Sequence, residues 1–160
     1  MNRKAISINY CEYETVSDLP EDEIELVNRA NAILEKAYAN YSGFHVGAAL
    51  LLDNGDIITG NNQENIAYPS SLCAERVALY FCKAHHPEAK VVKIAVMARS
   101  EKGELKEVIS PCGACRQVMS EYERNQNLDM KVIMKGEGQK MITFESVGDL
   151  LPLSFETKVL

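Results

Sequence analysis

The sequence predicts an α/β fold, namely a three-layer α/β/α domain built on a mixed five-stranded sheet. Apolar runs of strand length alternate along the chain with segments whose apolar residues recur at helical spacing. An Asn-Gly pair at residues 54–55 joins the first two apolar runs, which is a strong signal for an antiparallel hairpin. At 160 residues the chain is long enough for one domain with a full core, and two independent domains are not expected.

The N-terminal part divides into an extension, residues 1–20, and the start of a single domain, residues 21–160. Within the extension, residues 6–10 alternate between apolar and polar side chains, as in an edge strand. Residues 21–38 begin with acidic side chains, which stabilise the positive end of a helix dipole, and then repeat apolar residues at helical spacing. This segment is predicted to be a helix that serves packing.

Five segments make up the predicted sheet. They are residues 44–52, 56–60, 91–98, 131–134 and 140–144. The segment at residues 91–98 is expected to be central. Small residues in the first strand, beginning with Gly47, allow a neighbouring helix to approach closely.

Two further helices are predicted over residues 73–84 and 112–122, packed on the same face of the sheet, and both begin at cysteines. Cys112 and Cys115 are three residues apart, so both sulfurs face one side of a first helical turn, and Cys73 stands at the start of the other helix. Three thiolates can therefore converge on one ion. Zinc with three protein ligands keeps a fourth position for water, and none of the three histidines has metal-motif spacing to the cysteines.

Glu75 follows Cys73 by two residues, close enough to act as a proton carrier beside such an ion. A ligand-x-Glu pattern followed by Pro-Cys-x-x-Cys is typical of zinc deaminases, including a variant with three cysteines. Two alternatives remain open at this point: a redox pair formed by Cys112 and Cys115, and a purely structural zinc site with a fourth ligand. Neither accounts for Glu75.

Composition excludes several classes of partner. A net charge of −6, with no basic run, opposes binding to a nucleic acid polymer, whereas a free nucleoside needs no basic groove. No apolar run reaches the length that spans a bilayer, so no membrane partner is expected. The N-terminus lacks the apolar core of a secretory signal, and an odd set of five cysteines opposes a disulfide framework. A cytoplasmic location is expected.

A polar segment, residues 61–71, leaves the second predicted strand and leads to the first cysteine. Asn62 and Glu64 alternate on one side of an extended chain, a geometry suited to a sugar hydroxyl, and loops at strand ends commonly hold ligands. The alternative is a turn-rich connection that satisfies its own polar groups.

With these residues in view, the chain resembles the small zinc-dependent cytidine deaminases of pyrimidine salvage, of the homotetrameric type. The resemblance runs from about residue 23 to 157 and rests on separate motifs in the right order. These are Tyr41-Ser42 with Phe44 and residues 46–50, Asn62-x-Glu64-Asn65, Cys73-Ala74-Glu75-Arg76, the run from Ser110 to Gln117, and Leu150-Leu151-Pro152.

The resemblance implies hydrolytic deamination of cytidine and deoxycytidine to uridine and deoxyuridine by a zinc-activated water, with release of ammonia. It implies one Zn²⁺ per subunit on Cys73, Cys112 and Cys115, and proton transfer by Glu75. Because three thiolates weaken the Lewis acidity of zinc, Arg76 is expected to draw charge from a cysteine sulfur, the alternative being a surface ion pair.

The resemblance also implies the substrate contacts. Phe44 would pack on the pyrimidine, and Asn62 and Glu64 would hold the ribose 3′-hydroxyl. The main chain of Ala74 would bind the base carbonyl, and the Ser110 carbonyl would accept a hydrogen bond from the exocyclic amine.

Tyr68 and Phe155 resemble positions that reach the site of a neighbouring subunit in a homotetramer. Two alternatives accompany the assignment as a whole: a deaminase of another aminopyrimidine nucleoside, and a noncatalytic zinc-stabilised binding module.

Overall fold

The structure is a computed structural model that describes residues 1–156. Its helices are α1 (Glu21–Leu34), α2 (Ala74–His85) and α3 (Gly113–Gln126). Its strands are β1 (Cys11–Tyr13), β2 (Phe44–Leu52), β3 (Ile57–Asn61), β4 (Val91–Ser100), β5 (Lys131–Lys135) and β6 (Met141–Phe144). Short 3-10 turns lie at Val16–Asp18, Tyr68–Ser70 and Val147–Asp149.

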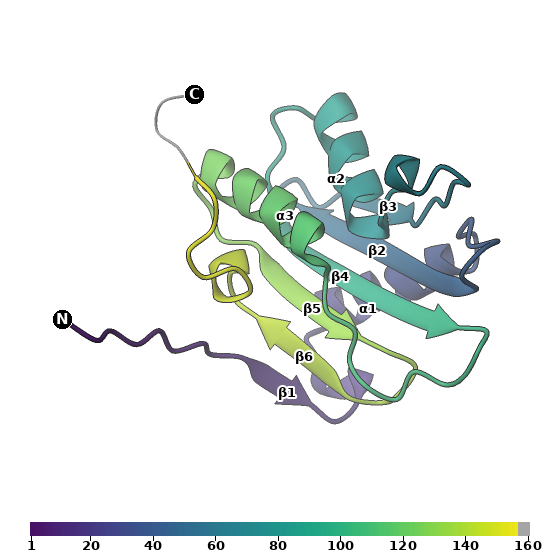
Figure 1. Cartoon of the computed structure of the whole chain (residues 1–160), viewed down its shortest axis with the longest axis horizontal. Coiled ribbons are helices and arrows are strands. Elements are labelled where there is room, and N and C mark those ends of the chain that lie inside the picture. The colour runs from purple at the N-terminus through teal and green to yellow at the C-terminus, as the bar shows by residue number, and fades with distance from the viewer. Residues whose placement is uncertain (157–160) are drawn as a thin grey trace.

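The strands form one mixed sheet in the order β1-β6-β5-β4-β2-β3 (Figure 1). The β4–β5 pair is parallel and the other neighbours are antiparallel, which confirms both the mixed sheet and the antiparallel hairpin of β2 and β3. Strand β4 lies in the interior of the sheet, as the sequence predicts.

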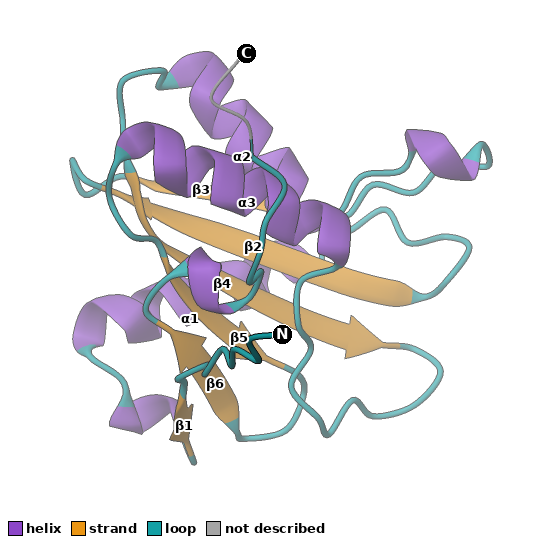
Figure 2. Cartoon of the chain, turned by 60° about the vertical axis from the view of Figure 1, so that its left-hand side comes forward, coloured by secondary structure: helices purple, strands orange, loops and turns teal. Residues whose placement is uncertain are grey.

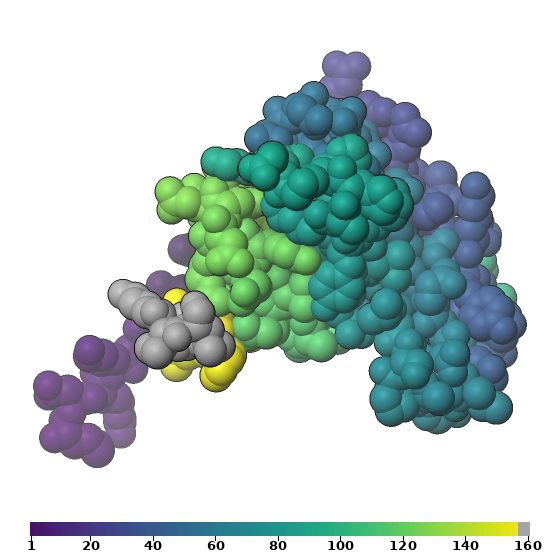
Figure 3. All heavy atoms as spheres, turned by 90° about the horizontal axis from the view of Figure 1, so that it is seen from above, coloured from purple at the N-terminus to yellow at the C-terminus, as the bar shows by residue number. Residues whose placement is uncertain are grey.

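The predicted count of five strands is wrong, because β1 adds a sixth at the edge. The edge strand lies at Cys11–Tyr13, directly after residues 6–10, where the alternating pattern predicts it. The reason is the length of its partner: β1 pairs with Met141 to Thr143, and β6 ends at Phe144. Residues before Tyr10 therefore have no strand beside them, and they project from the body of the molecule (Figures 1 and 3).

Helices cover both faces of the sheet, which gives the three predicted layers. Helix α1 lies on one face, and α2 and α3 lie side by side on the other (Figure 2). Alternate residues of β2 enter opposite cores: Ala48 and Leu50 pack with α2 and α3, whereas Ala49 packs with α1.

Helix α1 is shorter than predicted, ending at Leu34 instead of residue 38. The chain leaves the helix because Tyr38 is drawn into a bridge with Gln63: the Tyr38 amide donates to the carbonyl of Asn62, and the Glu64 amide donates to the carbonyl of Tyr38. This long-range pairing has no signal in the local helical periodicity. None of the helices within residues 1–156 combines the length and apolarity that crossing a membrane requires.

The close approach of helices to the sheet depends on two glycines. A Cβ atom at Gly47 would overlap the carbonyl oxygen of Ala30 on α1, which confirms the close helix contact predicted there. On the other face, a Cβ at Gly60 would lie 2.6 Å from the amide nitrogen of Ala78 on α2. Both neighbouring atoms belong to the backbone of a helix, so neither can move without moving the helix.

We expect Gly47→Ala to lower the free energy of unfolding by about 1–3 kcal/mol, because the added methyl group forces α1 away from β2. Urea unfolding followed by circular dichroism measures the change. Gly113→Ala is the matched control, since a Cβ there meets nothing within 4 Å and alanine favours a helix. Equal stability of the Gly47 variant and the wild type would contradict the role given to this contact.

Candidate active site

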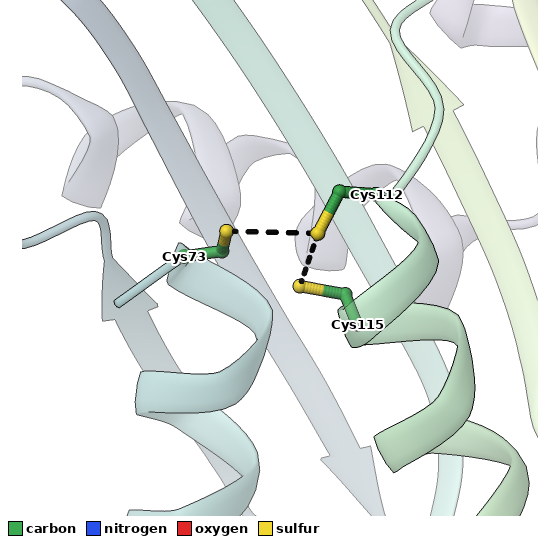
Figure 4. A group of neighbouring side chains, drawn as sticks. All are labelled: Cys73, Cys112 and Cys115. Atoms are coloured by element: carbon green, nitrogen blue, oxygen red, sulfur yellow. Dashed lines mark hydrogen bonds between the residues drawn. The ribbon is translucent and has the colours of Figure 1, made fainter. Parts of the chain in front are cut away.

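Two helix N-termini bring the three predicted cysteines together. Cys73 is the N-cap of α2, Cys112 is the N-cap of α3, and Cys115 lies in the first turn of α3 (Figure 4). The Cys112 sulfur lies 3.8 Å from that of Cys73 and 3.5 Å from that of Cys115. All three sulfurs lie within 4.8 Å of one another, and no other such cluster of His, Cys, Asp or Glu occurs in residues 1–156.

These distances fit a zinc ion better than a redox pair. Tetrahedral zinc with Zn–S bonds of about 2.3 Å requires neighbouring sulfurs about 3.8 Å apart. A disulfide requires about 2.05 Å between two sulfurs and has no use for a third. Because the Cys73 sulfur stands at the tetrahedral distance from Cys112, the geometry indicates three ligands to one ion.

The charges of the thiols also call for a cation. Hydrogen bonding from the Cys115 thiol and the Arg76 guanidinium lowers the pKa of Cys73 to about 5. The same hydrogen bond, with burial added, raises the pKa of Cys115. One thiolate thus forms readily and opposes the ionisation of Cys115, and a bound cation would stabilise negative charge on both sulfurs.

Glu75 lies in the first turn of α2 beside the cysteines and is 4% exposed. Burial raises the pKa of its carboxyl group, and the negative charge of Cys73 acts in the same direction. A carboxyl group with a raised pKa takes up and releases a proton closer to neutral pH, as general acid–base catalysis requires.

Arg76 points back to the cysteines. Its Nη2 atom donates to the Cys73 sulfur at 3.6 Å, and this hydrogen bond raises the pKa of the guanidinium. Within residues 1–156 no carboxylate lies at ion-pair distance from Arg76, so the alternative of a surface ion pair has no support in the structure.

A cleft of about 480 Å³ opens beside the cysteines. This volume lies in the range of small-molecule sites. The structure brings nine of the predicted site residues to its walls. They are Phe44, Asn62, Glu64, Tyr68, Cys73, Glu75, Arg76, Ser110 and Cys112.

Asn62 and Glu64 hold the main chain at the entrance of β2. The Asn62 side chain accepts from the amide of Val46 at 2.8 Å and donates to the carbonyl of Phe44 at 2.9 Å. The Glu64 Oε2 atom accepts from the amides of Tyr41 and Ser42 at 2.8 and 3.2 Å. Both polar side chains therefore fix the backbone that carries Phe44, a role that the spacing of the sequence does not reveal.

The other three predicted residues, Ala74, Cys115 and Phe155, do not line the cleft. Ala74, the first residue of α2, and Cys115 are fully buried. Tyr68 borders the cleft with a side chain that is 74% exposed. Phe155 is 75% exposed and does not line the cleft of its own chain, since its carbonyl is bound by Gln117 and Arg124 on α3.

Sequence reasoning missed the apolar walls of the cleft, which include Val46, Val96 and Ile109. Val46 lies two residues after Phe44 in β2, so strand alternation places both on one face and contained a usable signal. Val96 requires knowledge of the β2–β4 register, and Ile109 lies in a segment with no periodic pattern.

Comparison with known proteins assigns the family. Residues 20–128 match the sequence model described as the cytidine and deoxycytidylate deaminase zinc-binding region. A cytidine deaminase from Halalkalibacterium halodurans is 43% identical over 135 residues, which cover 84% of this chain and 94% of that protein. A blasticidin-S deaminase from Bacillus cereus is 26% identical over 140 residues, or 86% of this chain and 95% of that protein.

A solved structure shows the same fold. The crystal structure of a cytidine deaminase from Burkholderia pseudomallei superposes with a TM-score of 0.70 at 40% identity, covering 82% of this chain and 97% of that one. The cysteine cluster, the cleft and these similarities agree, and the chain belongs to the cytidine and deoxycytidylate deaminase zinc-binding family.

Proposed function

We propose that the chain is a zinc-dependent cytidine deaminase, which hydrolyses cytidine and deoxycytidine to uridine and deoxyuridine and releases ammonia. The observation that carries this proposal is the position of buried Glu75 beside three converging cysteine sulfurs, in a cleft of nucleoside size. The 43% identity to a relative named cytidine deaminase supports the choice of substrate.

Cys73, Cys112 and Cys115 hold one Zn²⁺ per subunit. When bound, zinc would act as a Lewis acid that lowers the pKa of a water molecule towards neutral pH. The chain offsets the excess charge of three thiolates in two ways. Arg76 donates to the Cys73 sulfur, and the N-termini of α2 and α3 point their positive ends at the cysteines.

Glu75 moves the protons of the reaction. As water adds to C4 of cytosine, Glu75 accepts a proton from the water and delivers it to N3. It then takes the remaining proton from the hydroxyl group on C4 and passes it to the exocyclic amine, which leaves as ammonia while the C4 carbonyl of uridine forms. The raised pKa of the buried carboxyl group favours both transfers.

The substrate is held from several sides. Phe44 packs on the pyrimidine, the main chain of Ala74 binds the base carbonyl, and the carbonyl of Ser110 accepts from the exocyclic amine. Asn62 and Glu64 bind the ribose 3′-hydroxyl. Their main-chain bonds engage Asn62 and only Oε2 of Glu64, which leaves Oε1 and one amide hydrogen for the sugar.

We further propose a homotetramer in which Tyr68 and Phe155 reach a neighbouring subunit, a role supported by their exposed rings. A cytoplasmic role in pyrimidine salvage is proposed as well. The cytoplasmic location is supported by the cysteines, three of which converge as metal ligands instead of pairing in disulfides. The single deaminase domain is placed at residues 21–160, after an extension at residues 1–20. A family match that begins at residue 20 supports this division, and residues 157–160 lie outside the described part.

The alternative substrate is another aminopyrimidine nucleoside, and the similarity to a blasticidin-S deaminase supports this alternative. The lower identity, 26% against 43%, places this substrate second.

We expect purified protein to convert cytidine to uridine, followed as a fall in ultraviolet absorbance, and to lose this activity after zinc is removed with a chelator. Added Zn²⁺ should restore it, because the three sulfurs already converge. Blasticidin S is assayed in parallel. Conversion of blasticidin S alone would replace the proposed substrate, and conversion of neither by the zinc-loaded protein would overturn the proposed reaction.

We expect Glu75→Gln to retain one zinc per chain but to lose at least about 10²-fold in kcat, because glutamine cannot carry the proton. Zinc content by atomic absorption and steady-state kinetics with cytidine give the two values. Glu25→Gln on the exposed side of α1 is the control and should behave as wild type. Full activity of the Glu75 variant would remove this residue from the mechanism.

A further inference from the structure

The segment that leads into Cys112 and Cys115 belongs to no helix or strand. Residues 108–111 carry Ile109 and Ser110 to the wall of the cleft and end at Cys112. Within the described residues, no backbone–backbone hydrogen bond of the loops and turns involves positions 108–111. Pro111 has no amide hydrogen to donate. The position of this segment must therefore be set by side chains.

Arg116, one turn into α3, supplies that restraint. Its Nη2 donates to the hydroxyl of Ser110 at 2.7 Å, and its Nε donates to the carbonyl of Pro111 at 2.8 Å. Its Nη1 donates to the carbonyl of Leu150 at 3.0 Å. The planar guanidinium thus ties the cleft segment to the turn near the C-terminus. This contact gives a role to Arg116 in the run from Ser110 to Gln117 and to the motif Leu150-Leu151-Pro152, neither of which the reaction itself uses.

All three acceptors are neutral, so the contacts of Arg116 hold the segment in position and do not neutralise a charge. Within residues 1–156 no carboxylate lies at ion-pair distance from its guanidinium. The three bonds leave in different directions from a rigid fork, which the single ammonium group of lysine cannot reproduce.

Arg116 acts on the cleft from outside. It does not line the cleft but borders a second hollow of about 240 Å³, and Ser110 borders both cavities. A substrate in the cleft would therefore meet Ser110, and Ser110 would be held in place by Arg116.

We propose that Arg116 is a positioning residue that sets the discrimination between substrate and product. By holding Ser110 and Pro111, it aims the carbonyl of Ser110 at the exocyclic group of the base. Cytidine donates a hydrogen bond to that carbonyl, whereas uridine presents its own carbonyl there, and two acceptors repel each other. This inference rests on the proposed function, because it assumes a cytosine base beside Ser110.

The test compares the KM for cytidine with the inhibition constant for uridine in Arg116→Met and Arg116→Lys. Loss of one aligned hydrogen bond should raise the KM for cytidine by about tenfold. The inhibition constant for uridine should not rise, because uridine gains no hydrogen bond from that carbonyl. The ratio of the inhibition constant to the KM should therefore fall by at least about tenfold. A role in folding alone would affect both ligands alike. Lysine should not restore the ratio, because it keeps the charge but loses the fork.

Arg99→Met is the matched control, since Arg99 is another half-buried arginine, on β4, that pairs with Glu35. It should keep the wild-type ratio. If Arg116→Met does not fold or bind zinc, Ser110→Ala decides, because it removes only the shortest bond and should lower the ratio by about two- to threefold.

An unchanged ratio in the folded Arg116 variant, or in Ser110→Ala where that variant decides, would overturn the inference, as would restoration by lysine. In each case an active wild-type enzyme would leave the proposed function standing. A wild-type protein that converts no cytidine would instead overturn the proposed function itself.

Discussion

The structure depends on how three like charges can be held at one point. The sulfurs of Cys73, Cys112 and Cys115 lie within 4.8 Å of one another, so the negative charges of three thiolates would repel one another there. Besides the metal ion, two features of the fold supply positive charge there. They are the guanidinium of Arg76 and the N-termini of α2 and α3, which begin at the cysteines. The parallel placement of α2 and α3 on one face of the sheet is therefore an electrostatic requirement as well as a matter of packing.

Close packing makes that arrangement precise. Gly60 lets the backbone of α2 rest directly on β3, so the height of the helix above the sheet, and with it the position of Cys73, is set by backbone contact. The polar residues that follow β3 then tie the start of β2 to the cleft through main-chain bonds from Asn62 and Glu64. The three cysteines and the walls of the cleft thus share one rigid support, as a preorganised site needs.

Much of this was predictable, for reasons visible in particular residues. The three cysteines and Glu75 carry their chemistry in residue type and local spacing, so the cysteine cluster follows from the sequence. Alternation and helical periodicity likewise predict the layers and the central strand. Long-range pairing was the part that escaped prediction: the bridge of Tyr38 with Gln63 ends α1 early, and the short β6 moves the edge strand to Cys11–Tyr13. Local patterns contain no information about such partners.

Two carboxylates of the cleft, Glu64 and Glu75, have different proposed tasks, and their surroundings shift their pKa values in opposite directions. Burial and the nearby charge of Cys73 raise the pKa of Glu75, which suits a group that accepts and returns protons. Glu64 is partly desolvated too, but hydrogen bonds from Ser42 and Tyr41 outweigh that effect and lower its pKa. The lowered pKa keeps Glu64 ionised as an acceptor of hydrogen bonds, whereas the raised pKa of Glu75 suits the proton transfers proposed for it. Burial and hydrogen bonding thus give two residues of one type different affinities for a proton.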